Sequence, residues 1–127
     1  MLPKKLRFES GDVLYLMRGY EGCLEIHTEE SFQKLFDSIS KLPTTQKNSR
    51  LHIRLTIGGS TDVIVDNQGR IQIPTLFMNN YALGKEVYLI GAINHLELWD
   101  KEAWEKYESD NEASFEDNAQ TLAGEEE

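Results

Sequence analysis

The chain has a single cysteine, three prolines and no apolar run that approaches the roughly 18 residues needed to span a membrane. The lone Cys23 cannot form an internal disulfide, which fits a reducing cytosol. No signal peptide opens the chain. These absences argue against a disulfide-stapled secreted domain and a helical membrane protein, so we predict a cytoplasmic protein. Its 127 residues suffice for one ordinary domain, or for two very small halves that share one core.

Positive charge is scarce at the C-terminal end. Residues 99–127 hold two lysines and eleven acidic residues, whereas residues 1–70 hold ten Lys/Arg and nine Asp/Glu. The net charge of −9 is therefore a property of the tail, and a near-neutral body with clustered arginines can still bind phosphate. We expect the tail, beyond Glu108, to be a frayed helix or disordered and to keep the protein soluble. A regulatory or DNA-mimicking role is the alternative.

Residues typical of catalytic or metal sites are also few. The three histidines are His27, His52 and His95. They lie far apart, without the cysteine or carboxylate spacing of a metal site, and Cys23 has no evident histidine partner. Glu25 and Glu97 occupy matching strand positions, which strand alternation places on the solvent side or at subunit contacts. We therefore predict no enzymatic activity, no cofactor, no bound metal and no small-molecule substrate.

The stretch from Val63 to Pro74 predicts a tight hairpin. Strand-favouring residues enter and leave it with a two-residue period, and Asp66-Asn67-Gln68-Gly69 between them suits a reversal. Asp and Asn bond back to nearby backbone, and Gly69 accepts a positive φ. Arg70 follows directly, so the turn should present a guanidinium at one end of the hairpin. Pro74 can then start a helix.

Part of this pattern recurs, which indicates two internal repeats. The matches are Leu2-Pro3 with Ile73-Pro74, Val13–Leu16 with Val87–Ile90, Leu24–Ile26 with Leu96–Leu98, and Thr28–Phe32 with Asp100–Trp104. One copy alone is too small to bury its apolar face, so each should cover the other. We assign residues 1–57 to the first repeat, 58–108 to the second and 109–127 to an acidic tail.

The remaining elements follow from periodicity and caps. The expected strands are 12–18, 22–26, 61–66, 69–73, 86–91 and 95–98. Thr28 should cap a helix that ends at Pro43, and Asp100 should cap one that carries Trp104 and Tyr107. A short helix should run from Pro74 to about Ala82. Residues 44–57 fit a strand and a helix equally well on periodicity alone.

These motifs, in this order, resemble the MraZ family of bacterial transcriptional regulators. Asp66, Gly69 and Arg70 match the family's Asp-x-x-Gly-Arg hairpin. The other similar stretches are Arg18-Gly19 with Gly22–Glu25 in the first copy, and Leu96–Asp100 with Trp104 in the second. The resemblance covers nearly the whole chain, from about Leu2 to Tyr107.

The resemblance implies an α+β fold, namely an AbrB-like (SpoVT/AbrB) double swapped-hairpin β-barrel with flanking helices, and it favours a helix over residues 44–57. It also implies a ring-shaped homo-oligomer that binds double-stranded DNA at direct repeats in the promoter of a division and cell-wall gene cluster. A location at the nucleoid follows from that role.

The sequence departs from the family at its start. Family members carry the hairpin before each of the two prolines, but here the first copy begins at Met1-Leu2-Pro3, so the N-terminal strand, turn and arginine are missing. Two explanations stay open: an upstream start in a longer natural protein, or true loss of half the recognition surface. A scaffold ring that has lost DNA binding with its first hairpin is therefore the alternative function.

Individual residues receive roles on this basis. We expect Arg70, Gln68 and Asn67 to contact DNA, and Asp66 and Gly69 to shape the turn. Two groups of basic residues, Lys4, Lys5 and Arg7 and then Lys47, Arg50 and Arg54, are the remaining positive clusters. We expect contacts between subunits from Arg50, Arg54 and Trp99.

Overall fold

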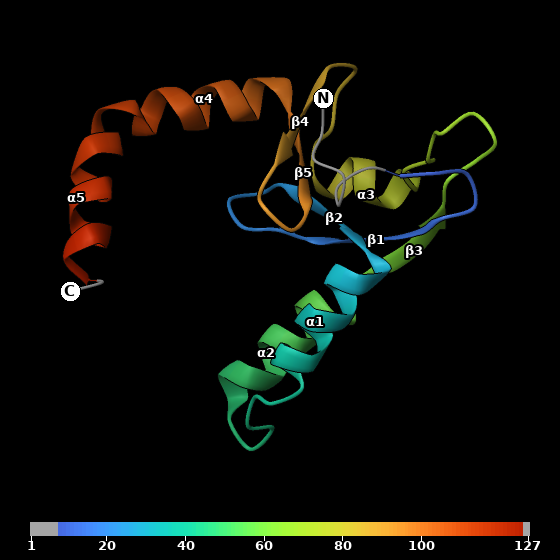
Figure 1. The fold of residues 1–127 in the computed structure, drawn as a ribbon, viewed down its shortest axis with the longest axis horizontal. Coiled ribbons are helices and arrows are strands. Elements are labelled where there is room, and N and C mark those ends of the chain that lie inside the picture. Colours follow the sequence, from blue (N-terminus) through green and yellow to red (C-terminus); the bar gives the residue numbers. More distant parts are fainter. Residues whose placement is uncertain (1–7, 126–127) are drawn as a thin grey trace.

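The computed structural model describes residues 8–125 and shows a five-stranded antiparallel sheet with helices on both faces (Figure 1). Its strands are β1 (Val13–Arg18), β2 (Leu24–Thr28), β3 (Thr61–Ile64), β4 (Val87–Gly91) and β5 (Leu96–Asp100). Its α-helices are α1 (Glu29–Ile39), α2 (Lys47–Thr56), α3 (Thr75–Asn80), α4 (Lys101–Asn111) and α5 (Phe115–Glu125), and a 3₁₀ turn, η2 (Glu112–Ser114), joins α4 to α5. The expected α+β class is confirmed. The basic residues Lys4, Lys5 and Arg7 and the expected match at Leu2-Pro3 lie outside the described residues.

The sheet runs in the order β3-β1-β2-β5-β4, so the β1–β2 and β4–β5 hairpins meet through β2 and β5. Across that central pair Leu24 lies opposite Leu98, Glu25 opposite Glu97 and Ile26 opposite Leu96. The segments Leu24–Ile26 and Leu96–Leu98, which the sequence analysis matched to each other, therefore pair antiparallel with Glu25 opposite Glu97 at the centre.

One expected repeat match is wrong by one residue. Leu14 pairs with Thr28 in the first hairpin, and Val87 pairs with Asp100 in the second. Because Thr28 and Asp100 are equivalent, Leu14 corresponds to Val87, where the sequence match had paired Val13 with Val87. The physical reason is the turn: five residues separate Arg18 from Leu24, but only four separate Gly91 from Leu96.

One face of the sheet carries the main apolar core. Side chains alternate along β2 and β5, so Leu24, Ile26, Leu96 and Leu98 share this face. They pack with Leu14, Leu16, Val65 and, from α3, Phe77. The opposite face is less apolar, and α1 and α2 cover it. There Tyr15 stacks on Phe32 of α1, with 4.2 Å between ring centroids.

Both predicted capping residues are confirmed. Thr28 accepts a hydrogen bond from the backbone N–H of Ser31, and Asp100 accepts one from Ala103. Asp100 also accepts from the backbone N–H of Gly84, at 2.9 Å, which ties the second cap to the loop before β4. Residues 47–56 form α2. This confirms the helix that the family resemblance favoured, where periodicity alone fitted a strand and a helix equally well.

Two expected elements differ from the structure. Residues 69–73 form no strand, because Gly69 and Arg70 only close the turn with Asp66, while Ile71 and Ile73 pack against the core without a ladder. The first helix ends at Ile39, before Pro43.

The tail is helical as far as Glu125, where we expected a frayed helix or disorder. Its Glu and Ala residues, together with Gln120 and Leu122, favour helix locally. Figure 1 shows α4 and α5 extending away from the sheet, with a bend between them at η2. Over residues 8–125, no helix combines the length and the apolar character needed to cross a bilayer.

Candidate nucleic-acid interface

The segment from Asp66 to Arg70 forms a closed turn after β3. The backbone N–H of Asp66 donates to the carbonyl of Arg70 at 2.8 Å, and that of Gly69 donates to the carbonyl of Asp66 at 3.0 Å. Asp66 Oδ1 accepts from the backbone N–H groups of Gln68 and Arg70, at 2.9 and 2.8 Å. Gly69 has a φ of +77°, which other residues adopt only with strain. One carboxylate therefore organises the whole turn.

The Arg70 guanidinium projects from this turn into solvent. Its side chain is 72% exposed, and its Nε lies 3.7 Å from Asp66 Oδ2. A terminal nitrogen of the guanidinium donates to the side-chain oxygen of Gln68. These neighbours orient the group without covering it, so its remaining N–H groups are free to meet a phosphate or a base edge.

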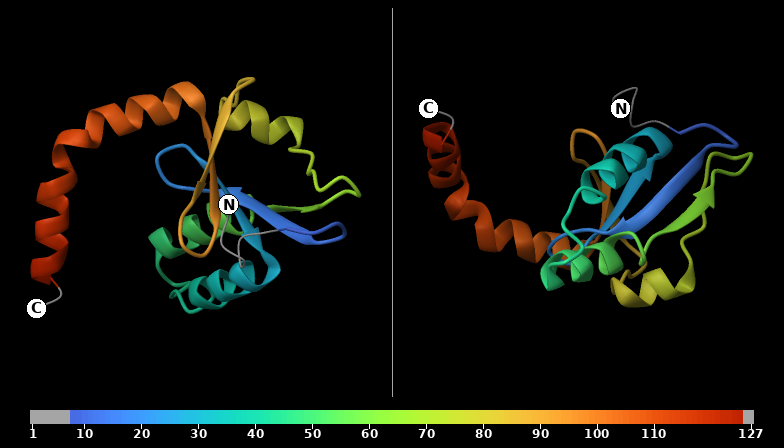
Figure 2. Two further views of the ribbon diagram at one scale, coloured as in Figure 1. Left: turned by 45° about the horizontal axis from the view of Figure 1, so that its top comes forward. Right: turned by 90° about the horizontal axis from the view of Figure 1, so that it is seen from below.

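A second turn, residues 9–12, lies beside the first. Ser10 Oγ donates to Asn67 Oδ1 at 3.2 Å, and the backbone N–H of Gly11 donates to the carbonyl of Val65 at 2.9 Å. Figure 2 shows both turns projecting from the same end of the sheet. Asn67 is therefore held against Ser10, while Gln68 is held against Arg70.

The residues expected at subunit contacts fall into two groups. Arg54 is exposed on α2, and Arg50 donates to the carbonyl of Thr44 at 3.0 Å. Trp99 is only 4% exposed, because it packs against Trp104 and Tyr107 of its own chain. It therefore offers little surface to another subunit.

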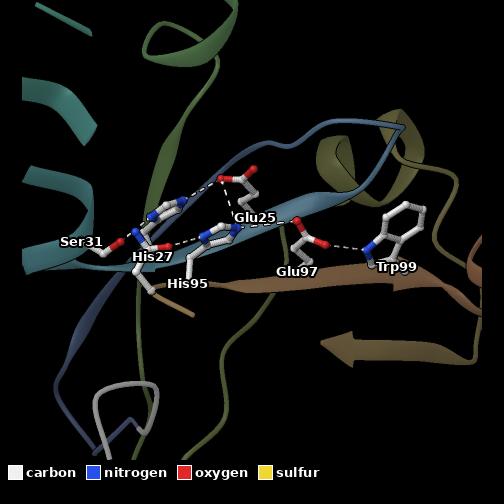
Figure 3. Close-up of polar contacts among 7 residues, drawn as sticks. Glu25, His27, Ser31, His95, Glu97 and Trp99 are labelled. Carbon is white, nitrogen blue, oxygen red and sulfur yellow. Dashed lines mark hydrogen bonds and ion pairs between the residues drawn. The ribbon is translucent and has the colours of Figure 1, made fainter. Parts of the chain in front are cut away.

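A polar cluster that the sequence analysis missed lies on the α1 side of the sheet. The register that places Ile26 opposite Leu96 continues to place His27 beside His95. The two imidazole rings stack, with 4.8 Å between centroids and 13° between planes (Figure 3). Two histidines that we treated as separate therefore meet, together with Glu25 and Glu97. Combining the repeat match with an antiparallel β2–β5 pairing is the signal that could have found them.

Cys23 lies at the other end of the same strand pairing and is 1% exposed. Burial is the main cause that raises the pKa of its thiol from 9.0 to about 12, and nearby carboxylates, first that of Glu97, add to the shift. The thiol is therefore protonated at neutral pH and is a poor nucleophile.

Alkaline pH should destabilise the fold through Cys23. Above pH 9 the unfolded chain loses the thiol proton, whereas the folded chain keeps it up to a pKa of about 12. The folded state then binds more protons, so the free energy of unfolding should fall by up to about 1.4 kcal/mol per pH unit in this window. Urea unfolding at pH 8 to 11 measures this fall, which should be shallower in Cys23→Ala. Parallel curves for the two proteins would contradict the assignment.

The described fold is that of a small α+β protein made of two similar hairpins, with an exposed arginine on a carboxylate-organised turn. Residues 56–125 match the family model described as "MraZ protein, putative antitoxin-like". The chain belongs to the MraZ family.

Three curated relatives agree with this membership, and each is named transcriptional regulator MraZ. The protein of Paenarthrobacter aurescens (strain TC1) is 36% identical over 115 residues, which cover 91% of this chain and 80% of the relative. That of Arthrobacter sp. (strain FB24) is 34% identical over 98% of this chain and 87% of its own length. That of Alkaliphilus metalliredigens (strain QYMF) is 33% identical, with coverages of 95% and 85%.

Proposed function

We propose that this protein is a non-enzymatic transcriptional regulator that binds double-stranded DNA in a sequence-specific way. The observation that carries the proposal is the Asp66–Arg70 turn, which presents a guanidinium that is 72% exposed on a hydrogen-bonded support. Membership of a family whose relatives are named transcriptional regulators supports the same function.

Arg70 supplies the recognition chemistry. A guanidinium at the tip of a turn can donate two parallel hydrogen bonds to a phosphate or to the O6 and N7 acceptors of guanine in the major groove. A good bidentate base contact discriminates by about 1–3 kcal/mol. Gln68 and Asn67 add polar groups on either side, while Asp66 and Gly69 hold the turn in place.

The AbrB-like swapped-hairpin architecture remains a proposal, and the strand order supports it. β3 belongs to the second repeat in sequence, yet it pairs with β1 of the first, where Leu14 lies opposite Val63. A strand that precedes one hairpin thus completes the other. Residues 1–57 and 58–108 are then two halves, the second of which contributes β3 to the first, followed by the tail of residues 109–127.

Assembly into a homo-oligomeric ring would raise the affinity. One arginine contact per chain binds DNA weakly. When several linked chains face spaced repeats, the first contact raises the effective concentration of the others at the DNA, so the overall affinity rises without any new kind of contact. We propose that Arg50 and Arg54 contribute to contacts between chains. The proposed targets are direct repeats in the promoter of a division and cell-wall gene cluster, bound in the cytoplasm at the nucleoid.

A second candidate function is an oligomeric protein-interaction scaffold. The observation that favours it is the edge strand β4, whose Val87, Tyr88 and Leu89 are exposed. An exposed edge with apolar side chains can pair with another chain. Such a protein would assemble without recognising DNA.

Binding to the promoter region upstream of the protein's own gene tests the proposal. Fluorescence anisotropy should show tighter binding to that fragment than to a shuffled sequence of equal length, with an affinity that falls as salt rises. Equal affinity for both fragments would contradict sequence-specific recognition. An assembled protein with no affinity for either would favour the scaffold function.

A further inference from the structure

The two repeats place four ionisable side chains together where β2 meets β5. Glu25 and Glu97 lie directly opposite each other across the strand pair, with side chains that are 12% and 24% exposed. Like charges in this position repel, and partial burial weakens the screening by water. His27 and His95 lie beside them (Figure 3).

The imidazole of His95 is oriented but unsatisfied. Its Nδ1 lies 2.8 Å from the side-chain oxygen of Asn94, which accepts a hydrogen bond in the tautomer with the proton on Nδ1. Its Nε2 is buried and lacks a hydrogen-bond partner among the described residues. In the neutral ring this Nε2 carries a lone pair, and it faces the carboxylates of Glu25 and Glu97 at 3.8 and 3.6 Å.

We propose that Glu25, His27 and His95 bind a zinc ion, with Glu97 as a further oxygen ligand. The ligand atoms of the first three residues all lie within 4.8 Å of one another. Zinc binds imidazole nitrogen and carboxylate oxygen at about 2.0–2.2 Å, and two ligands of a tetrahedral ion lie about 3.3–3.5 Å apart on those bond lengths. A cation here would neutralise the opposed carboxylates and use the lone pair of His95.

The distances show what must move on binding. His95 Nε2 already lies near ligand spacing from Glu25 and Glu97, at 3.8 and 3.6 Å. His27 Nε2 lies 2.8 Å from Glu25 Oε1, which is a hydrogen bond. That pair must open by about half an ångström, and His27 must bind as the tautomer with its proton on Nδ1, where Ser31 Oγ can accept it, because a ligating imidazole nitrogen carries no proton.

The surrounding groups hold the proposed ligands as outer contacts in metal sites usually do. Ser31 Oγ lies 2.8 Å from His27 Nδ1, and Asn94 holds the Nδ1 of His95. The indole of Trp99 donates to Glu97 Oε1 at 3.1 Å, which leaves the other oxygen facing His95. Three of the four proposed ligands, His27, His95 and Glu97, are therefore held by an outer contact.

Metal titration of the full chain tests the site. Tag-free protein, stripped with a chelator, is titrated with zinc by calorimetry at pH 7.5, and its melting temperature is followed with and without zinc. We expect one zinc per chain and a rise in melting temperature when zinc is added. No heat of binding and an unchanged melting temperature would overturn the proposal.

Two variants and a matched control identify the ligands. His95→Gln and Glu25→Gln should each weaken zinc binding by about tenfold or more, while His52→Gln, on α2 and outside the cluster, should leave it unchanged. Cobalt, added as a spectroscopic probe, should give visible absorption in the wild type and lose it in His95→Gln. Circular dichroism checks that each variant folds, and Glu97→Gln replaces any that does not. Unchanged affinity in the folded cluster variants, or an equal loss in His52→Gln, would overturn the assignment.

Discussion

Replacing Arg70 with alanine should abolish specific DNA binding and leave the fold and the assembly intact. The side chain is 72% exposed and supports no core residue, so its loss removes recognition without a packing cost. Each chain loses about 1–3 kcal/mol of binding free energy. These losses add over all the chains that contact one DNA fragment. Anisotropy with the promoter fragment measures binding, and light scattering measures the assembly.

Two further arginine variants sharpen this test. Arg70→Lys keeps the charge but not the bidentate geometry, so binding that survives in the lysine variant would assign Arg70 to a phosphate. Arg18→Ala makes the same change of charge at the exposed far end of β1 and should leave specific binding unchanged. Retained specific binding by Arg70→Ala, with an unchanged salt dependence, would contradict the role of Arg70.

Replacing Leu24 with alanine should cost about 2–5 kcal/mol of unfolding free energy, the largest stability effect that we expect from one side chain. Leu24 is fully buried at the pairing of β2 with β5, so its truncation leaves a cavity between the two halves. Leu96 is equally buried at the equivalent position of the second half, so Leu96→Ala should have a similar effect. Urea unfolding at fixed protein concentration measures both.

An exposed leucine provides the control for the core variants. Leu122 on α5 is 60% exposed, and Leu122→Ala should change the unfolding free energy by no more than about 0.5 kcal/mol. If Leu24→Ala does not fold, Ile26→Val gives a milder test with an expected cost of about 0.5–1.5 kcal/mol. A loss below about 1 kcal/mol in a folded Leu24→Ala would contradict the shared core.

The sequence predicted best where a few neighbouring residues decide the structure. The turn at Asp66–Gly69 and the caps at Thr28 and Asp100 follow from the chemistry of single side chains. Residues 44–57 could not be decided in this way. Leu51 and Leu55 of α2 are both exposed, so no strongly buried face imposes a period on that segment.

Features set by long-range packing escaped prediction. Ile71 and Ile73 alternate as in a strand, but they pack on the core without a pairing strand among the described residues. The meeting of His27 with His95 needs the register between segments about 70 residues apart, and no local pattern contains that information. Strand alternation was expected to place Glu25 and Glu97 on the solvent side or at subunit contacts, but they lie opposite each other within the chain and are mostly buried.

The pairing of β2 with β5 brings together segments that the sequence analysis matched, but their side chains differ. In that match His27 corresponds to Trp99 and Cys23 to His95, so each segment brings different groups to the pairing. Two copies of the first half would pair histidine with cysteine, and two copies of the second would pair histidine with tryptophan. Neither arrangement would reproduce the stacked imidazoles. The two segments are therefore not interchangeable, because the stacked imidazole pair needs one histidine from each of them.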